Sequence, residues 1–406
     1  MSSSIFANLA AKKSLKQFLG SNDSTRDYLS SNIVPVNILF SGRINGGIAK
    51  GKITQMSADS SLGKTMIGMA LLKQAQREGM HCVVIDSEHT WDAKNAKVNG
   101  IDISEDKLMV FDTADITAIK DVFTSLYVEK EDSHGRFIYY PMEDRKNIFV
   151  LFDSWGALMT NTQTSKAMEG STTADMGGST KEKNQLANAM SESRCTIFVV
   201  NHVISNLGGF GDPLAVPGGK KIYFVSDGIG MAMSAAKSKD GEETEMDKIT
   251  GGVKGKIVTC VIKKGRTARE SKKIKFRINY EDTGSGGGID QWFGLLDLAM
   301  EHGCVVKGKD GYERPGIENE DSLWDDWSHE KKGKQYKDIY CKEFWLPLFK
   351  NTDFGDFLEK AFAFSSEDDL ATSKTDIAAE FEEFVGKKAE DAKPKKKAKK
   401  FKDDDE

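Results

Sequence analysis

Cysteine is scarce in this 406-residue sequence, and long apolar runs and a secretory leader are absent. The five cysteines are scattered and form no CxxC pair, which is typical of buried thiols in a reducing cytosol. No stretch approaches the roughly 18 apolar residues that a membrane span requires. The N-terminus has no apolar signal-peptide region. These absences exclude a membrane-spanning or exported chain, and we expect a soluble, cytoplasmic protein with no membrane partner.

An excess of positive charge is also lacking. The 57 Lys and Arg residues are outnumbered by 62 Asp and Glu, which gives a formal net charge of -5. A nucleic-acid partner would therefore have to meet a local basic surface. No internal repeat stands out. The length suits one large domain or two modest ones, with enough chain for a buried core.

One stretch, Ala58–Thr65 (ADSSLGKT), reads as a phosphate-binding loop. The β-favouring run 52–57 precedes it, and residues 65–77 after it carry apolar side chains at helical spacing. In that setting, backbone N–H groups and the helix N-terminus direct positive partial charge at one spot, where a polyphosphate can bind. The sequence therefore predicts a nucleotide site.

Within this loop each residue type has a physical role. Gly63 permits close approach of the backbone to phosphates, Lys64 offers an ammonium group to the β- and γ-phosphates, and Thr65 offers a hydroxyl to Mg²⁺. Ala58 stands where such loops begin with Gly, and because Ala tolerates a positive φ less well, that end could bend differently. The predicted ATP-binding loop residues are Asp59, Ser60, Ser61, Leu62, Gly63, Lys64 and Thr65.

Apolar strand-like runs alternate with helical segments along the rest of the first two thirds of the chain. This alternation predicts an α/β fold with a mostly parallel sheet and with sites at the carboxyl ends of the strands. Strands are expected at 33–41, 52–57, 81–87, 107–112, 147–153, 195–201, 255–264 and 273–280, and helices at 65–77, 116–130 and 181–194.

Two acidic residues follow predicted strands and suit ATP hydrolysis. Asp153 closes an apolar run, which is the position from which an Asp helps to hold Mg²⁺ in folds of this kind. Glu88 follows another strand and could be the general base that orients water toward the γ-phosphate. Each could instead be an ordinary residue at a strand end. Together with Lys64 and Thr65, they complete the set that ATP hydrolysis needs.

Longer motifs resemble one family. Residues 84–92 (VIDSEHTWD) resemble the strand and catalytic-glutamate segment of RecA recombinases. Residues 37–47 (NILFSGRINGG), 287–299 (GGIDQWFGLLDLA) and 343–350 (EFWLPLFK) resemble the phage UvsX branch of that family. The resemblance covers about residues 30 to 365. It implies a RecA-like P-loop ATPase core, filaments on single-stranded DNA, homologous pairing and strand exchange.

The resemblance also implies partners and DNA-binding loops. The partners would be single- and double-stranded DNA, further copies of the chain in a helical homo-oligomer, a single-strand-binding protein and a recombinase loader. Two glycine-rich stretches, 161–180 and 203–221, match the DNA-binding loops by position, although each could be an ordinary active-site lid. Phe210, flanked by glycines, could stack on bases. The predicted DNA-binding residues are Lys166, Lys181, Gly208, Gly209, Phe210, Gly211, Gly218, Gly219 and Lys220.

Further nucleotide contacts are implied by the same resemblance. His202 stands where bacterial relatives have a nucleotide-sensing glutamine. Lys264 and Arg266 resemble the paired cations that reach a neighbouring subunit's ATP, although they could be a solvated hairpin tip. Tyr280 could flank the adenine, and Asp92 could contact its amino group.

Four regions are expected: an N-terminal arm (1–30), the ATPase core (31–288), a small C-terminal subdomain (289–365) and a charged, disordered tail (366–406). The arm could pack on its own domain or on a neighbour. The lysine-rich tail could hold DNA or an accessory protein, or act only as a solubilising segment. If a phage encodes the chain, the compartment is the host cytoplasm. A hexameric helicase of the same superfamily and a nucleotide-gated DNA-binding scaffold with little hydrolysis stay open as alternatives.

Overall fold

The computed structural model describes residues 26–131, 133–160, 176–205, 214–215, 219–234, 255–279, 288–317, 331–332, 335–336, 339 and 341–364. The chain divides into two compact units. The first consists of residues 1–294 and 358–365, and the second of residues 295–357 and 366–406. Among the described residues, no helix is both long and apolar enough to cross a membrane.

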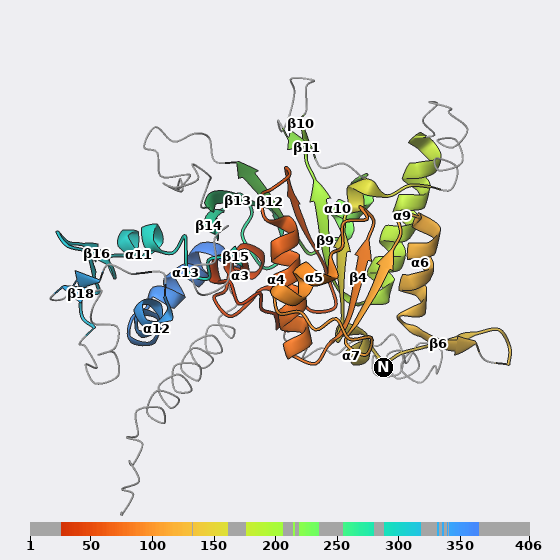
Figure 1. The fold of residues 1–406 in the computed structure, drawn as a ribbon, viewed down its shortest axis with the longest axis horizontal. Coiled ribbons are helices and arrows are strands. Elements are labelled where there is room, and N and C mark those ends of the chain that lie inside the picture. The colour runs from red at the N-terminus through yellow and green to blue at the C-terminus, as the bar shows by residue number, and fades with distance from the viewer. Residues whose placement is uncertain are drawn as a thin grey trace, which may run out of the picture. The chain divides into compact units, whose positions relative to one another are not determined.

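A nine-stranded sheet forms the centre of the first unit, in the order β15-β14-β13-β12-β3-β9-β8-β4-β5 (Figure 1). The six strands from β12 to β5 are parallel, and β13, β14 and β15 run antiparallel. This confirms the predicted α/β class. The strands are β3 (Ile53–Ala58), β4 (His81–Asp86), β5 (Leu108–Asp112), β8 (Ile148–Asp153), β9 (Thr196–His202), β12 (Gly228–Ser234), β13 (Gly255–Gly265), β14 (Lys273–Asn279) and β15 (Gly288–Ile289).

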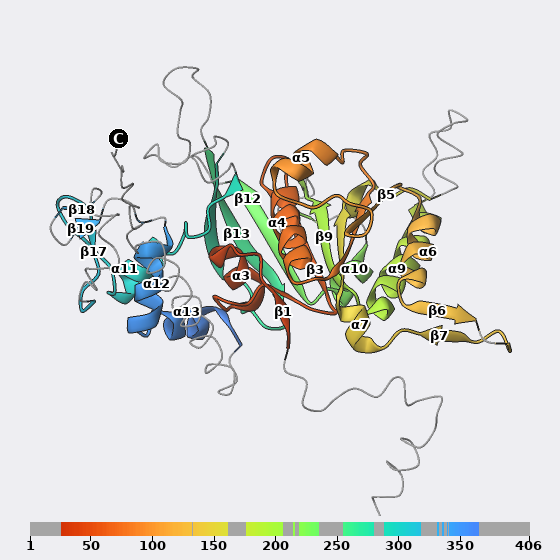
Figure 2. The same ribbon diagram turned by 60° about the horizontal axis from the view of Figure 1, so that its bottom comes forward.

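Helices cover both faces of this sheet (Figures 1 and 2). On one face, α4 (Lys64–Arg77) packs against the side chain of Leu151. On the other face, α6 (Ile116–Ser125), α9 (Met176–Ser193) and α10 (Lys220–Val225) close a core that includes the neighbouring side chains Val150 and Phe152. Successive residues of a strand point to opposite faces, so a near-continuous apolar run such as β8 requires both layers.

The strand expected at 33–41 is wrong, because the structure has a helix there. The helix α3 spans Val34–Ser41 and all eight of its residues are buried. Pro35 lies in its first turn, where a missing N–H costs no hydrogen bond. Gly42, with φ of 77°, ends the helix and donates its N–H to the carbonyl oxygen of Ile38. A short apolar run that is buried on all sides has the same pattern in a strand and in a helix, so the pattern alone does not distinguish them.

The helix expected at 116–130 is too long. Helix α6 ends at Ser125, and an antiparallel hairpin follows, made of β6 (Val128–Glu131) and β7 (Phe137–Tyr139). The rings of Tyr127 and Tyr139 stack at 5.4 Å, a contact that a continued helix could not make. The chain then enters α7 (Met142–Lys146). Strand β12 was also missed, because its GIGMAMS sequence carries two glycines that weaken a strand pattern.

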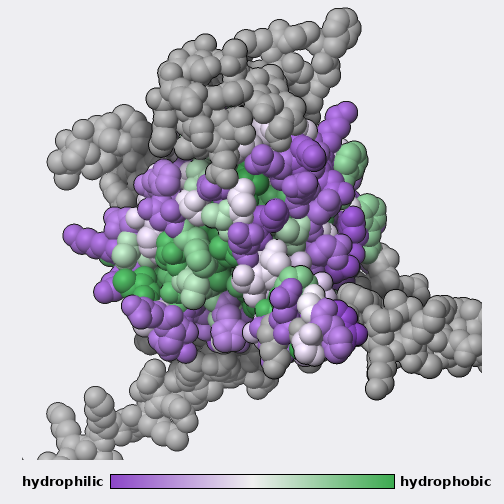
Figure 3. All heavy atoms as spheres, turned by 90° about the vertical axis from the view of Figure 1, so that its right-hand side faces the viewer, coloured by the Kyte–Doolittle hydropathy of each residue, from purple (hydrophilic) through white to green (hydrophobic). Residues whose placement is uncertain are grey.

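Strand β5 is the last strand at one side of the described sheet. Its backbone pairs only with β4 there, and Met109 in it is 54% exposed. Figure 3 views the molecule from this side of Figure 1, and apolar side chains gather on it within a polar border. An edge strand beside exposed apolar surface is a surface on which another chain can pair and pack.

The second unit is small and rich in aromatic side chains. It contains α11 (Leu296–His302), α12 (Lys342–Asn351) and a four-stranded sheet. The ring of Trp345 packs 5.2 Å from that of Phe344 and 6.2 Å from that of Phe354. The strands of this sheet are β16 (Val306–Lys307), β17 (Tyr312–Glu313), β18 (Lys331–Lys332) and β19 (Gln335–Tyr336). Helix α13 (Phe354–Phe362) contributes residues to both units, because the division falls between residues 357 and 358.

Candidate nucleotide site

The phosphate loop follows β3 and leads into α4, as the sequence predicts. Gly63 lies in the left-handed region with φ of 80°, and a Cβ atom at that position would stand 2.8 Å from Cδ1 of Ile278. Glycine therefore satisfies both the backbone and the space. Ala58 ends β3 in regular pairing with His202, so no positive φ is needed there.

A cavity of about 360 Å³ opens at this loop. That volume lies within the usual range for small-molecule sites. The cavity is lined by Ser61, Gly63, Lys64, Thr65, Met66 and Ile278.

Lys64 begins α4 and is 7% exposed. Its Nζ donates hydrogen bonds to the carbonyl oxygens of Ala58 at 2.9 Å and Asp59 at 2.7 Å. Burial lowers the pKa of this ammonium group, and the nearby carboxylates of Asp153 and Glu88 oppose that shift. The loop thus holds a buried cation at the helix N-terminus, which suits a phosphate group.

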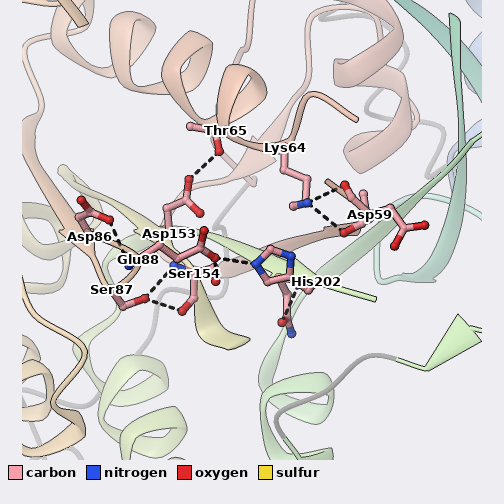
Figure 4. A network of polar contacts seen from close by, with 11 residues as sticks. Asp59, Lys64, Thr65, Asp86, Ser87, Glu88, Asp153, Ser154 and His202 are labelled. Carbon is pink, nitrogen blue, oxygen red and sulfur yellow. Dashed lines mark hydrogen bonds and ion pairs between the residues drawn. The ribbon is translucent and has the colours of Figure 1, made fainter. Parts of the chain in front are cut away.

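Thr65 and Asp153 form the candidate magnesium ligands. The Thr65 hydroxyl donates to Oδ2 of Asp153 at 2.7 Å (Figure 4). Burial raises the pKa of Asp153, and the negative charges of Glu88 and Asp86 add to the rise, while the bond from Thr65 opposes it. A bound cation would relieve this crowding of negative charge. Hydroxyl and carboxylate oxygens are the ligands that Mg²⁺ prefers, so these residues fit that ion.

No group of three His, Cys, Asp or Glu side chains arranged for a metal occurs in the part of the chain that the structure describes. Thr65 and Asp153 would supply two protein oxygens, and Mg²⁺ is commonly held by one or two such oxygens together with substrate phosphates.

Glu88 lies in the turn after β4. Asp86 shapes this turn, because its carboxylate accepts the N–H of Glu88 at 3.2 Å and that of Trp91 at 2.6 Å. Oε1 of Glu88 accepts one hydrogen bond from the Ser154 hydroxyl and one from Nε2 of His202 at 2.6 Å. Burial by itself raises the pKa of Glu88, but these two bonds and the charges of His202 and Lys64 together outweigh it and hold the pKa below its usual range. Glu88 is therefore ionised at neutral pH, as a general base must be.

Sheet register explains why residues distant in sequence meet here. Asp86 of β4 is paired with Asp153 of β8, and Ala58 of β3 with His202 of β9. All four strands are parallel, so their carboxyl ends lie at one edge of the sheet, which we call the carboxyl edge. Figure 4 shows Lys64, Thr65, Glu88, Asp153, Ser154 and His202 gathered there. Ser154 was not predicted from the sequence as a site residue, although its position directly after Asp153 could have indicated it.

Lys264 and Arg266 lie at the opposite end of the strands, which we call the amino edge. Gly228, the first residue of β12, pairs with both Thr54 near the start of β3 and Gly265 at the end of β13. Nζ of Lys264 donates to the carbonyl oxygens of Tyr223 at 2.7 Å and Phe224 at 2.9 Å. Burial lowers the pKa of Lys264, and the charge of Arg266 adds to the shift. These cations are therefore not brought to the chain's own phosphate loop.

Of the two residues expected near adenine, Asp92 lies within the described residues and Tyr280 does not. Asp92 is the N-cap of α5 (Ala93–Val98), where its Oδ1 accepts the N–H of Lys94 at 2.8 Å. Tyr280 lies outside the described residues, but Ile278, two positions earlier, lines the cavity. Both adenine contacts stay predictions.

Most of the expected DNA-binding residues lie outside the described residues: Lys166, Gly208, Gly209, Phe210, Gly211 and Gly218. Lys181 lies exposed in the first half of α9, and Lys220 is the exposed first residue of α10, directly after Gly219. Oδ1 of Asn184 in α9 would stand 3.9 Å from a Cβ atom at Gly219. Gly219, near the end of the second glycine-rich stretch, therefore lies close to α9.

The fold and site define an α/β protein with a RecA-like P-loop core. Residues 11–124 match the sequence model of the RecA N-terminal domain, and residues 292–358 match that of the C-terminal domain of the bacteriophage T4 recombination and repair protein. The recombination and repair protein of Enterobacteria phage T4 is 23% identical over 399 residues, covering 97% of this chain and 92% of that relative. Protein RecA of Aquifex pyrophilus is 26% identical over 276 residues, covering 66% of this chain and 68% of the relative.

The chain is similar to the RecA family of recombinases, and along nearly its whole length it is similar to the phage UvsX type of that family. Both predictions of the sequence, the family and the fold, are thereby confirmed. This similarity supports a role in recombination and repair, suggests nucleotide binding, and implies DNA binding and self-association.

Proposed function

We propose that this chain is a DNA-dependent ATPase that forms helical filaments on single-stranded DNA. With ATP and Mg²⁺ it catalyses homologous pairing and strand exchange with double-stranded DNA in recombination, repair and recombination-dependent replication. A single-strand-binding protein and a recombinase loader are its expected accessory partners.

The observation that carries this proposal is the meeting of Lys64, Thr65, Asp153 and Glu88 at the carboxyl edge. Lys64 would bind the β- and γ-phosphates, while the oxygens of Thr65 and Asp153 would hold Mg²⁺. When bound, that ion neutralises charge on the phosphate oxygens. Glu88, ionised and fixed through one oxygen, would accept a proton from the water that attacks the γ-phosphate.

A second part of the proposal concerns Lys264 and Arg266. Strand β3 has six residues and therefore spans about 20 Å, and these cations lie at its far end from the phosphate loop. If they reach a nucleotide, that nucleotide belongs to another copy of the chain. Cations supplied by a neighbour would stabilise the charge that spreads over phosphate oxygens in the transition state. Hydrolysis would then depend on assembly.

Features of the first unit support assembly and DNA binding. Strand β5 offers an edge, with apolar surface on the same side of the molecule (Figure 3), for a second copy. Lys181 and Lys220 offer exposed cations where the two glycine-rich stretches enter α9 and α10. Such cations would contact the DNA backbone without reading its sequence.

The test is ATP turnover of the purified full chain with and without single-stranded DNA, combined with electron microscopy of the assemblies. A DNA-stimulated ATPase in filaments is the expected result. Closed rings would favour the hexameric helicase instead. Filaments on DNA with no turnover would favour the nucleotide-gated scaffold.

A further inference from the structure

Ser154 stands between the candidate magnesium ligand and the candidate base. It follows Asp153 directly in the chain, and it has 0% exposure. A hydroxyl has one hydrogen to donate, and that of Ser154 is donated to Oε1 of Glu88 (Figure 4). His202 donates to the same oxygen at 2.6 Å. Two donors thus fix one oxygen of Glu88 and leave Oε2 to accept a proton from water.

The backbone of Ser154 is itself fixed by Ser87. The Ser87 hydroxyl donates to the carbonyl oxygen of Ser154 at 2.6 Å and accepts its N–H at 2.8 Å. Ser87 precedes Glu88, so the two segments that carry Asp153 and Glu88 are joined at this point. These bonds use only the backbone of Ser154. A substitution of its side chain should therefore leave them in place.

We propose that Ser154 is a positioning residue, which holds the carboxylate of Glu88 at a set place relative to Asp153 and the phosphate loop. This proposal rests on the proposed ATPase function. A glutamate side chain has three rotatable bonds, and a general base must lie within hydrogen-bond reach of its proton. Loss of the Ser154 hydroxyl would leave His202 as the one remaining donor of the pair and would let the carboxylate move. The direction of the Glu88 pKa agrees, because the Ser154 bond is one of the two that lower it.

The first experiment is the Ser154→Ala substitution in the full chain on single-stranded DNA. We expect kcat for ATP to fall by about tenfold to a hundredfold, the range for a lost hydrogen bond to a charged group and a displaced reacting group. The KM for ATP and the Kd for ATP should stay within about twofold, because the phosphate loop is not altered. Ser193→Ala is the matched control. Ser193 is equally buried, but its hydroxyl donates to the carbonyl oxygen of Met190 at the end of α9, so its kcat should not change.

The second experiment is a double-mutant cycle with Glu88→Asp, which already withdraws the carboxylate from Ser154. If Ser154 acts through Glu88, adding Ser154→Ala to Glu88→Asp changes kcat by less than about twofold, and the two effects do not multiply. Effects that multiply, or an unchanged kcat in Ser154→Ala, would overturn the positioning role. Thermal unfolding of each variant distinguishes a specific loss of kcat from a loss of folded protein. Full turnover in Glu88→Gln would refute Glu88 as the base, on which the role of Ser154 rests, whereas full turnover in Ser154→Ala together with a defective Glu88→Gln would overturn the role of Ser154 alone.

Discussion

The two edges of the nine-stranded sheet differ in the sign and the arrangement of their charges. At the carboxyl edge, Asp153 and Glu88 are held by hydroxyl and imidazole donors beside one cation, Lys64. At the amino edge, several cations lie around the carboxylate of Asp227. Asp227 there is 4% exposed and accepts a bond from Arg26 at 2.9 Å.

The pKa of Lys52 reports the same asymmetry. Burial lowers it first, and the positive charges of Arg194, Arg26 and Arg266 lower it further, while Asp227 alone opposes them. Under the proposed function, the two edges would divide the groups that act on phosphate. The carboxyl edge would supply the base, the metal ligands and Lys64, and the amino edge would supply further cations at a distance from the chain's own phosphate loop. Contact between the two edges of neighbouring copies would bring these groups together.

The largest expected effect comes from removing groups at the carboxyl edge. Lys64→Ala should remove both ATP binding and turnover, whereas Glu88→Gln should lower turnover by about a thousandfold or more and retain ATP-dependent DNA binding. The reason is that Glu88 activates water but need not hold phosphates. Steady-state turnover and filter binding of labelled DNA measure the two properties. Unchanged turnover in Glu88→Gln would refute the assignment.

A slightly smaller loss is expected at the amino edge. The Lys264→Ala, Arg266→Ala double variant should hydrolyse ATP about a hundredfold more slowly, because transition-state charge loses its cations. Mixed with Glu88→Gln, it should regain part of its rate, since some interfaces then pair an intact Glu88 with intact cations. As a control, the Lys264→Ala, Arg266→Ala protein is mixed with a Lys64→Ala, Glu88→Gln double variant. That double variant keeps Lys264 and Arg266 but can neither bind ATP nor hydrolyse it. Absence of recovery in filaments shown to contain both proteins would place the cations outside the site.

Gly63→Ala should have an intermediate effect on the carboxyl edge. Its φ of 80° and the 2.8 Å approach to Ile278 both disfavour a Cβ atom, so the loop must shift. We expect ATP affinity to fall by about tenfold, which corresponds to about 1.4 kcal/mol. Calorimetric titration with an ATP analogue measures the change. The further substitution Ile278→Val, which removes the contacting methyl group, should recover part of it, and no recovery would assign the loss to backbone strain alone.

The smallest effect is expected from Ala58→Gly. Because Ala58 pairs regularly in β3 and needs no positive φ, turnover should change by less than about twofold. A large gain in turnover would mean that Ala58 restrains the loop. That result would favour the scaffold with little hydrolysis for the natural sequence.

Much of the carboxyl edge could be predicted from sequence because its parts are local. A strand, a Gly-Lys-Thr loop and a helix lie within 25 residues, from 53 to 77, and their spacing alone indicates phosphate binding. Asp153 and Glu88 each follow an apolar run that ends at the sheet edge. The strands β4, β8 and β9 were found in the same way, since burial on both faces leaves a continuous apolar pattern.

The contacts among these parts were decided only in the tertiary structure. Ser154 and His202 reach Glu88 from 66 and 114 positions away in sequence, and no local pattern encodes strand order or register. The apolar pattern of residues 34–41 is the same for a buried strand and for a buried helix. Packing in the folded chain therefore selected the helix. Lys264 and Arg266 lie at the amino edge because β13 reverses direction beside β12. Sequence determined which groups are present, and the pairing of strands distant in sequence determined which of them can act together.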